Sequence, residues 1–265
     1  MKGIAFFVEG GTEYDFIRQL LKTNYCELGE PKTYKGGVHI FNSIDNKYRV
    51  RICNAGSDSK VNKLVNDELW EMNKKGYSMC ICLKDLRGEN KKHAPRTFLD
   101  IVEIKNAENK MLKIFNNDSL STYSIHAIME IETWFIAETS HFVRINPNLT
   151  QQYIEAKTKD IEGEINPFNC SLKMIEKPAE TLNSIYKLAP NAKLKYDKDS
   201  RHRNHTIDAL DFQSLTQNVA ARIEKDLEPE LSSKSKLEPY YKDKFGSLRT
   251  LVDALDIFFE KKQTK

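Results

Sequence analysis

Short apolar runs alternate with amphipathic stretches over the first 140 residues of this 265-residue chain, and this alternation constrains the fold more than any other feature. A continuous apolar run occupies residues 4–8, and largely apolar runs occupy 77–83 and 123–129, which is the pattern of strands buried on both faces of a parallel sheet. Between the runs, apolar residues recur at helical spacing, as in the stripe from Phe16 to Leu21. The sequence therefore predicts an α/β fold with a largely parallel sheet flanked by helices.

Local signals refine this prediction. Thr12 followed by Asp15 resembles a capping box at the start of the first helix. The short β-like runs at 38–41 and 48–53 predict a hairpin or two successive strands, and Gly76 is placed as the stop of the second helix. A further helix is expected over residues 98–115.

The remainder of the chain reads as mostly helical. Scattered proline, asparagine and threonine over 141–180 suggest an irregular insertion or a small helical lobe, and amphipathic stripes follow to the C-terminus. Residues 228–239, with two prolines, are the best linker candidate. We expect an α/β core over 1–140 and, over 141–265, a mostly helical insertion and C-terminal extension that can pack on the same core.

Composition excludes several classes of protein. Lys and Arg number 41 against 38 Asp and Glu, and 30% charged with 40% hydrophobic residues is a globular and not a disordered composition. No apolar window reaches the length of about 18 residues that a membrane span needs, and the N-terminal run meets Glu9 too early for a signal peptide. Five cysteines without a C-x-x-C spacing are expected to be reduced in the cytoplasm, with Cys80 and Cys82 as inward neighbours on a strand. No glycine-rich nucleotide-binding motif is present, so no cofactor pocket is expected.

A carboxylate stands at the end of each of the three predicted buried strands. Glu9 follows Val8, Asp85 follows the run at 77–83, and Glu130 follows Met129. The carboxyl edge of an open parallel sheet is where ligands bind, so these acids are expected to meet in space. Clustered carboxylates favour a bound cation, and oxygen-only ligation suits Mg²⁺ or Mn²⁺ better than Zn²⁺. Such ions commonly act on phosphates.

Two further acids can join this group. Glu13 follows Glu9 by four residues across the Gly10-Gly11 turn, where the missing side chains allow close approach to the backbone. Glu132 lies two residues beyond Glu130. It shares a strand face with Glu130 if the strand persists, and it can point away if a helix begins there.

Phe7-Val8-Glu9-Gly10-Gly11-Thr12-Glu13, together with an apolar strand that ends in Asp85, resembles the Toprim domain, in particular the small-Toprim and OLD-nuclease branch. The segment 126–137, with its E-x-E-x-W pattern, looks like the DUF4276 and RloB-like group of bacterial Toprim-like proteins. The later Lys195-Tyr196-x-Lys198 and Ile207-Asp208 segments are also similar to that group.

The resemblance implies a divalent-metal phosphodiesterase fold that is often associated with phage defence and sometimes paired with an ABC or SMC-like ATPase. It implies that Glu9 is a metal ligand or general acid/base and that Asp85 is a metal ligand. Glu13 and Glu130 match auxiliary acidic positions.

The chain departs from the Toprim pattern at one place. The family usually carries Asp-x-Asp where this chain has Asp85-Leu86-Arg87, so a cation replaces the second carboxylate. Glu89 could substitute for it, or Arg87 could grip a phosphate through its planar guanidinium. We expect one strongly held metal, with a second recruited by substrate.

Basic residues cluster after Asp85. Lys84, Arg87, Lys91 and Lys92 are candidates for contacts with a substrate phosphate, although charge runs are usually solvated surface. The basic segment 193–205 is similar but distant in sequence. Trp134 is expected to pack in the core beneath the site and not to stack on a base.

These observations predict a cytoplasmic, metal-dependent nuclease of the Toprim type that hydrolyses phosphodiester bonds in DNA or RNA. Glu9, Asp85, Glu130 and Glu132 would hold the metal, with catalysis by Glu9, Glu13 and Asp85. An interaction subunit that has lost its chemistry and docks an ATPase or toxin partner is the alternative. A primase-like or nucleotidyl-transfer role ranks last, because no template-binding or zinc module is evident.

Overall fold

The computed structural model describes residues 1–86, 120–128, 130–159, 166–170, 172, 175, 177–190, 193–198, 201–226 and 245–261. Over these residues the chain forms a seven-stranded sheet in the order β2-β3-β4-β1-β5-β6-β7. The strands are β1 (Lys2–Val8), β2 (Lys32–Tyr34), β3 (Val38–Asn42), β4 (Tyr48–Asn54), β5 (Tyr77–Leu86), β6 (Ser121–Ile128) and β7 (Phe245–Gly246). The five strands from β4 to β7 in this order run parallel, whereas β2 and β3 are antiparallel additions at one edge.

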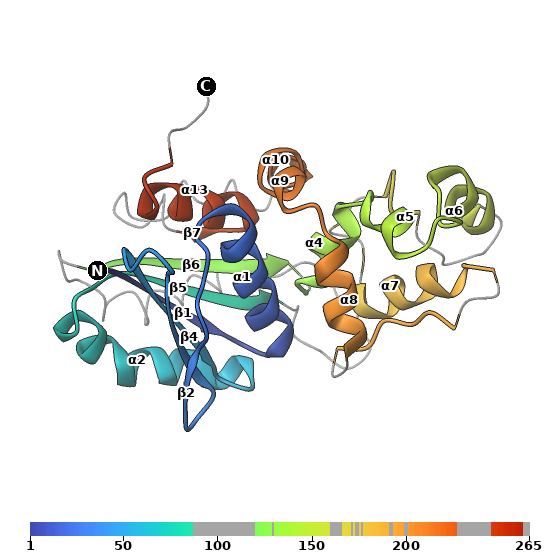
Figure 1. Cartoon of the computed structure of the whole chain (residues 1–265). Coiled ribbons are helices and arrows are strands. Elements are labelled where there is room, and N and C mark those ends of the chain that lie inside the picture. The colour runs from blue at the N-terminus through green and yellow to red at the C-terminus, as the bar shows by residue number, and fades with distance from the viewer. Residues whose placement is uncertain are drawn as a thin grey trace.

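Helices cover both faces of the sheet (Figure 1). Helix α2 (Asp58–Lys74) packs on one face, and α1 (Gly11–Asn24) and α13 (Leu248–Phe258) pack on the other. Strand β1 serves both layers, because Ile4, Phe6 and Val8 belong to the cluster beneath α1 while Ala5 and Phe7 belong to the cluster beneath α2. The predicted α/β fold with a largely parallel, helix-flanked sheet and a helical C-terminal extension is confirmed.

The order of the parallel strands creates a crossover point in the middle of the sheet. After β1 the chain passes along the α1 face to β4 on one side, and it then returns along the α2 face to β5 on the other side of β1. In doubly wound sheets the connections diverge at such a point and leave a crevice beyond the carboxyl ends of the two strands. The ends of β1 and β5 therefore define the place where a ligand is expected.

A lobe of short helices lies beyond this carboxyl edge, next to the end of β6 (Figure 1). Its helices are α4 (Glu132–Ala137), α5 (His141–Ile145), α6 (Gln151–Thr158), α7 (Pro178–Lys187) and α8 (Arg201–Ala209). The chain then passes through α9 (Phe212–Ser214), a π-helical turn (Leu215–Val219) and α10 (Ala220–Asp226). Helix α4 contacts β6, α8 contacts α1, and α13 packs on β6 with β7 completing the sheet.

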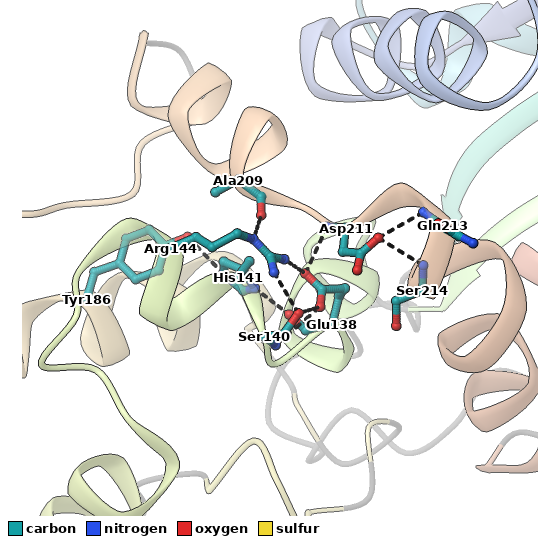
Figure 2. A network of polar contacts seen from close by, with 9 residues as sticks. All are labelled: Glu138, Ser140, His141, Arg144, Tyr186, Ala209, Asp211, Gln213 and Ser214. Atoms are coloured by element: carbon teal, nitrogen blue, oxygen red, sulfur yellow. Dashed lines mark hydrogen bonds and ion pairs between the residues drawn. The ribbon is translucent and has the colours of Figure 1, made fainter.

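A partly buried polar network holds the lobe helices together (Figure 2). The Glu138 carboxylate, which follows α4, lies 2.8 Å from the Arg144 guanidinium and accepts a 3.2 Å hydrogen bond from the Asp211 backbone N–H. His141 Nε2 lies 3.0 Å from the Tyr186 hydroxyl. These contacts connect the end of α4 with α5, α7 and α9, so the helices that border the sheet edge are held in fixed relation.

Several local predictions are confirmed and one is wrong. The 38–41 and 48–53 runs form the antiparallel pair β3 and β4, and Gly76 ends the second helix with a φ of +76°. The capping box is wrong: the first helix begins at Gly11 without a side-chain cap, and Asp15 pairs elsewhere. Strand β5 runs to Leu86, so Asp85 is its penultimate residue and lies at the carboxyl edge, as predicted. The helix expected over 98–115 and the linker at 228–239 lie outside the described residues.

The cysteines agree with expectation where the structure describes them. None of the five forms a disulfide, and Cys80 and Cys82 are fully buried on the α2 side of β5. Among the described helices, none combines the length and apolar character required to cross a membrane.

Candidate functional site

The carboxylates of Glu9 and Asp85 meet where β1 and β5 end. The parallel register pairs Val8 with Leu83, which brings the residue after β1 level with the last residues of β5. The Asp85 backbone N–H donates a 3.3 Å hydrogen bond to Oε2 of Glu9. Oδ1 of Asp85 accepts a 3.0 Å hydrogen bond from the backbone N–H of Ile131, so the loop after β6 joins the same place.

Glu13 and Glu132 join these two residues in a group of acids, of which Glu9 is half-buried and the other three are buried. Glu13 lies in the first turn of α1 with 5% of its surface exposed. Glu132 is the first residue of α4 and is fully buried. A helix does begin at Glu132, but the side chain lies against the cluster. We call Glu9, Glu13, Asp85, Glu130 and Glu132 the acidic cluster.

Mutual repulsion and burial shift the protonation of these groups. Burial, reinforced by the negative charges of Glu132 and Glu9, raises the pKa of Glu13 to about 7. Burial together with Glu13, Glu132 and Glu9 raises the pKa of Asp85 well above its ordinary value. Carboxyl groups that lie far apart in the sequence thus interact electrostatically, as expected if the strand ends meet at the crossover point.

Lys198 places an ammonium group within the acidic cluster. Its Nζ lies 3.1 Å from Oε1 of Glu130 and 3.2 Å from Oε2 of Glu132. Burial opposes the charge on Lys198, but the carboxylates outweigh it and raise its pKa. The same ammonium acts against the upward shift in the pKa of Glu13 and Asp85.

Glu130 lies at the rim of the cluster and connects it to the helical lobe. Its Oε2 accepts a 3.2 Å hydrogen bond from the backbone N–H of Ala179 in the first turn of α7. A carboxylate is favoured there, because the first N–H groups of a helix have no partner within the helix. Glu130 therefore binds both Lys198 and α7.

The loop over residues 193–198 is fastened to the cluster on both sides of Lys198. The Tyr196 hydroxyl donates a 2.6 Å hydrogen bond to Oε1 of Glu132, and the Tyr196 N–H donates a 3.1 Å bond to Asn183. The Arg203 guanidinium donates a 2.5 Å bond to the Lys198 carbonyl. These contacts explain how a segment remote in sequence reaches the sheet edge.

Arg203 also connects this loop to the first helix. Its guanidinium lies 2.6 Å from Oδ2 of Asp15, and it crosses so close to Gly11 that a Cβ at that position would lie 2.8 Å from one of its nitrogens. A side chain at position 11 would displace the end of Arg203, so glycine is favoured there by this close approach and not by a positive φ. The Gly10-Gly11 turn thus leaves room for the Arg203 side chain beside α1.

The predicted phosphate-binding residues are only partly placed. Arg87, Lys91 and Lys92 lie outside the described residues, as does Glu89. Lys84 is buried and continues the alternate series of Cys80 and Cys82 on the α2 side of β5, opposite Asp85. Contact of these four basic residues with a phosphate stays a prediction.

Sequence reasoning noted the basic segment 193–205 but did not place it at the site. Tyr196 and Lys198 are nevertheless the residues that contact Glu132 most directly. The sequence does hold one indication of this contact. A tyrosine and a lysine two residues apart can donate to carboxylates, and the predicted sheet edge holds more acids than bases. Trp134 is fully buried against Phe16, with ring centroids 5.6 Å apart, which confirms its role in the core.

The donor set of the cluster fits a hard divalent cation. It offers carboxylate oxygens from five residues against one ammonium, and Mg²⁺ and Mn²⁺ prefer such ligands. Among the described residues, however, no three His, Cys, Asp or Glu side chains already stand in a geometry that would hold a metal. Lys198 and the Ile131 N–H engage several of the oxygens, so a metal would require side chains to move.

Comparison with known proteins assigns no family. No family model matches the chain, and no curated protein matches it. One similar solved structure is a futalosine hydrolase mutant of Helicobacter pylori strain 26695, at 10% identity and a TM-score of 0.24, covering 49% of this chain and 69% of that chain. A likeness this weak carries no argument about function. The fold and the site define an α/β protein with a buried acidic cluster at the crossover point of its sheet.

Proposed function

We propose that this protein is a divalent-metal-dependent phosphodiesterase, a Toprim-type nuclease that hydrolyses DNA or RNA with Mg²⁺ or Mn²⁺. The observation that carries the proposal is the convergence of Glu9, Glu13, Asp85 and Glu132 at one edge of the sheet, where the Asp85 N–H binds Glu9 and burial beside neighbouring carboxylates raises the pKa of Glu13 and Asp85. These acids come from the ends of β1 and β5 and the starts of α1 and α4, and they converge where doubly wound sheets bind ligands. Structural stability alone gives no reason to bury three mutually repelling carboxyl groups beside a fourth that is half-buried.

The residues divide into roles by position. Glu9 and Asp85, at the crossover point, would hold the metal with Glu130 and Glu132. A bound divalent ion would supply Lewis-acid activation of a phosphoryl oxygen or of an attacking water. Glu13, in the first turn of α1 beside these ligands, is the candidate for exchanging a proton with the attacking water or the leaving group. The resemblance of the motifs extends the proposal to cytoplasmic antiviral defence, with an ABC or SMC-like ATPase as possible partner.

The test is a cleavage assay with paired variants. Purified protein is incubated with single- and double-stranded DNA and with RNA, in Mg²⁺, Mn²⁺ or EDTA. We expect cleavage only with divalent metal, and a loss of about 100-fold or more in Glu9→Gln plus Asp85→Asn, because removal of metal ligands abolishes that chemistry. Asp67→Asn plus Glu71→Gln, on α2, removes the same charge away from the cluster and should cleave like wild type. Undiminished cleavage by the first variant would refute the proposal.

One observation favours the alternative, a catalytically degenerate interaction subunit. Lys198 already engages Glu130 and Glu132, as a fixed replacement for a lost metal would. Calorimetric titration with Mn²⁺ separates the two functions. A nuclease site binds Mn²⁺ in a manner that depends on Glu9, whereas a degenerate site shows no such binding.

A further inference from the structure

We infer that Lys198 is a tethered counter-ion that neutralises the acidic cluster in the metal-free protein and competes with a divalent cation for Glu130 and Glu132. This inference rests on the proposed function, since it concerns occupancy of the proposed metal site. It assigns the site two alternative cations, one carried by the chain and one taken from solution.

The contacts of Lys198 are those of a shared cation and not of a simple surface pair. One ammonium lies within 3.2 Å of oxygens from two different residues, one of them the fully buried Glu132. A buried carboxylate without a compensating charge is strongly disfavoured, so Glu132 depends on this ammonium while no metal is present. The hydroxyl of Tyr196 binds only the other oxygen of Glu132, which leaves Oε2 to the cation.

The contacts of the 193–198 loop fix the backbone at Lys198 but allow its ammonium group to move away from the acidic cluster. Tyr196 binds Glu132 and Asn183, and Arg203 binds the Lys198 carbonyl, so the backbone is held on both sides. The Lys198 side chain is 32% exposed, and a lysine ammonium is carried on a flexible four-carbon stem. The side chain can therefore rotate toward solvent without release of the loop.

Competition follows from the oxygens involved. Oε1 of Glu130 and Oε2 of Glu132 cannot bind the ammonium and a metal ion in the same position. The free energy by which Lys198 stabilises the metal-free protein must be overcome when metal binds, so by linkage it weakens the apparent affinity for metal. Removal of the ammonium should therefore destabilise the metal-free protein and strengthen metal binding. A residue with only a structural role would not produce this opposite pair of effects.

The experiment titrates Mn²⁺ into metal-free full-length protein by isothermal calorimetry, and thermal unfolding is followed with and without saturating Mn²⁺. The variants are Lys198→Met and Lys198→Gln. Lys195→Met is the control, because it removes the same charge from the same loop at an exposed residue that, within the described part of the chain, pairs with Asp197 and not with the acidic cluster. Lys198→Gln keeps the test available if Lys198→Met does not fold without metal.

We expect Lys198→Met or Lys198→Gln to bind Mn²⁺ about tenfold more tightly than wild type, and Lys195→Met to stay within about twofold. The Tm of the Lys198 variants should be lower than that of wild type in EDTA, with the deficit abolished by Mn²⁺. Equal or weaker Mn²⁺ binding by the Lys198 variants would overturn the inference and leave the metal site standing. Binding by the variants alone would support the inference but overturn the nuclease proposal, and binding by none of the proteins would overturn both.

Discussion

The hydroxyl of Tyr196 donates a 2.6 Å hydrogen bond to Oε1 of Glu132, two buried residues that lie 64 positions apart in the sequence. Glu132 begins α4, and Tyr196 belongs to the loop that delivers Lys198. The bond therefore joins the helical lobe to the acidic cluster at a group whose charge is costly to bury. Burial raises the pKa of Glu132, and this hydrogen bond acts against that rise.

Replacement of Tyr196 by phenylalanine tests this bond. Glu132 would lose a donor to its buried carboxylate, and hydrogen bonds to charged groups are worth about 1.5–3 kcal/mol. We expect the free energy of unfolding, measured in urea at neutral pH, to fall by about that amount. Tyr153→Phe is the matched control, because the Tyr153 hydroxyl donates only to the neutral carbonyl of Leu188 and its loss should cost about 1 kcal/mol. Equal losses in the two variants would contradict the special place of Glu132.

The pair of Arg203 and Asp15 gives a second prediction. Both side chains are less than one-fifth exposed and their charged atoms lie 2.6 Å apart, so the pair is largely shielded from solvent. A double-mutant cycle with Arg203→Met and Asp15→Asn should give a coupling free energy of about 1–2 kcal/mol. The exposed pair Lys177 and Glu180, at 3.0 Å, should give less than about 0.5 kcal/mol. Similar couplings would mean that Arg203 does not fasten the loop to α1.

The parallel sheet could be predicted because its signal is local. Strands such as 4–8 and 77–83 are almost wholly buried on both faces, and their largely apolar runs indicate that burial directly. The acids at their ends could be predicted as neighbours, since parallel strands bring their carboxyl ends to one edge. The meeting of Glu9 with Asp85 therefore follows from strand order alone.

The contact between Lys198 and Glu132 could not be predicted from strand order. Lys198 reaches Glu132 through tertiary contacts of Tyr196 and Arg203, and no periodicity records such contacts. The facing of Glu132 depended on whether β6 continued or a helix began, which is a difference of only a few residues. Asp15 resembled a cap in sequence, but Arg203 offers it a stronger, charged partner.

Glu13 gives a pH prediction for the metal-free protein. Its pKa is about 7 in the folded state against about 4.5 in an unfolded chain, so folding binds a proton between these values. The contribution of Glu13 to stability is therefore unfavourable above pH 7 and improves as the pH falls toward 4.5. Glu13→Gln imitates the protonated acid, and in EDTA we expect it to stabilise the protein at pH 8 by about 1–3 kcal/mol and to have little effect near pH 5.

The control for Glu13 is Glu180→Gln, which removes an exposed carboxylate on α7. Its effect on stability should stay within about 0.5 kcal/mol at both pH values. Urea unfolding at pH 5 and pH 8 compares each of the two variants with wild type. A stabilisation by Glu13→Gln that did not change with pH would show that charge repulsion in the cluster is not its source.

His141 gives a prediction of opposite sign in the network of the helical lobe. Full burial lowers the pKa of His141 to about 4, and its ring nitrogens contact the Glu138 carbonyl and the Tyr186 hydroxyl. An unfolded histidine titrates near 6.5, so between pH 6.5 and 4 the unfolded chain binds a proton that the folded chain excludes. Wild type should therefore lose up to about 3 kcal/mol of stability from this residue as the pH falls through that range.

His141→Asn should be less stable than wild type at pH 8, because a buried hydrogen-bonded ring is lost, but its stability should depend less on pH below 6.5. His205→Asn, at an exposed residue of α8, should preserve the wild-type pH dependence. Urea unfolding from pH 4.5 to 8 measures the difference, and parallel curves for wild type and His141→Asn would rule out His141 as the buried neutral group.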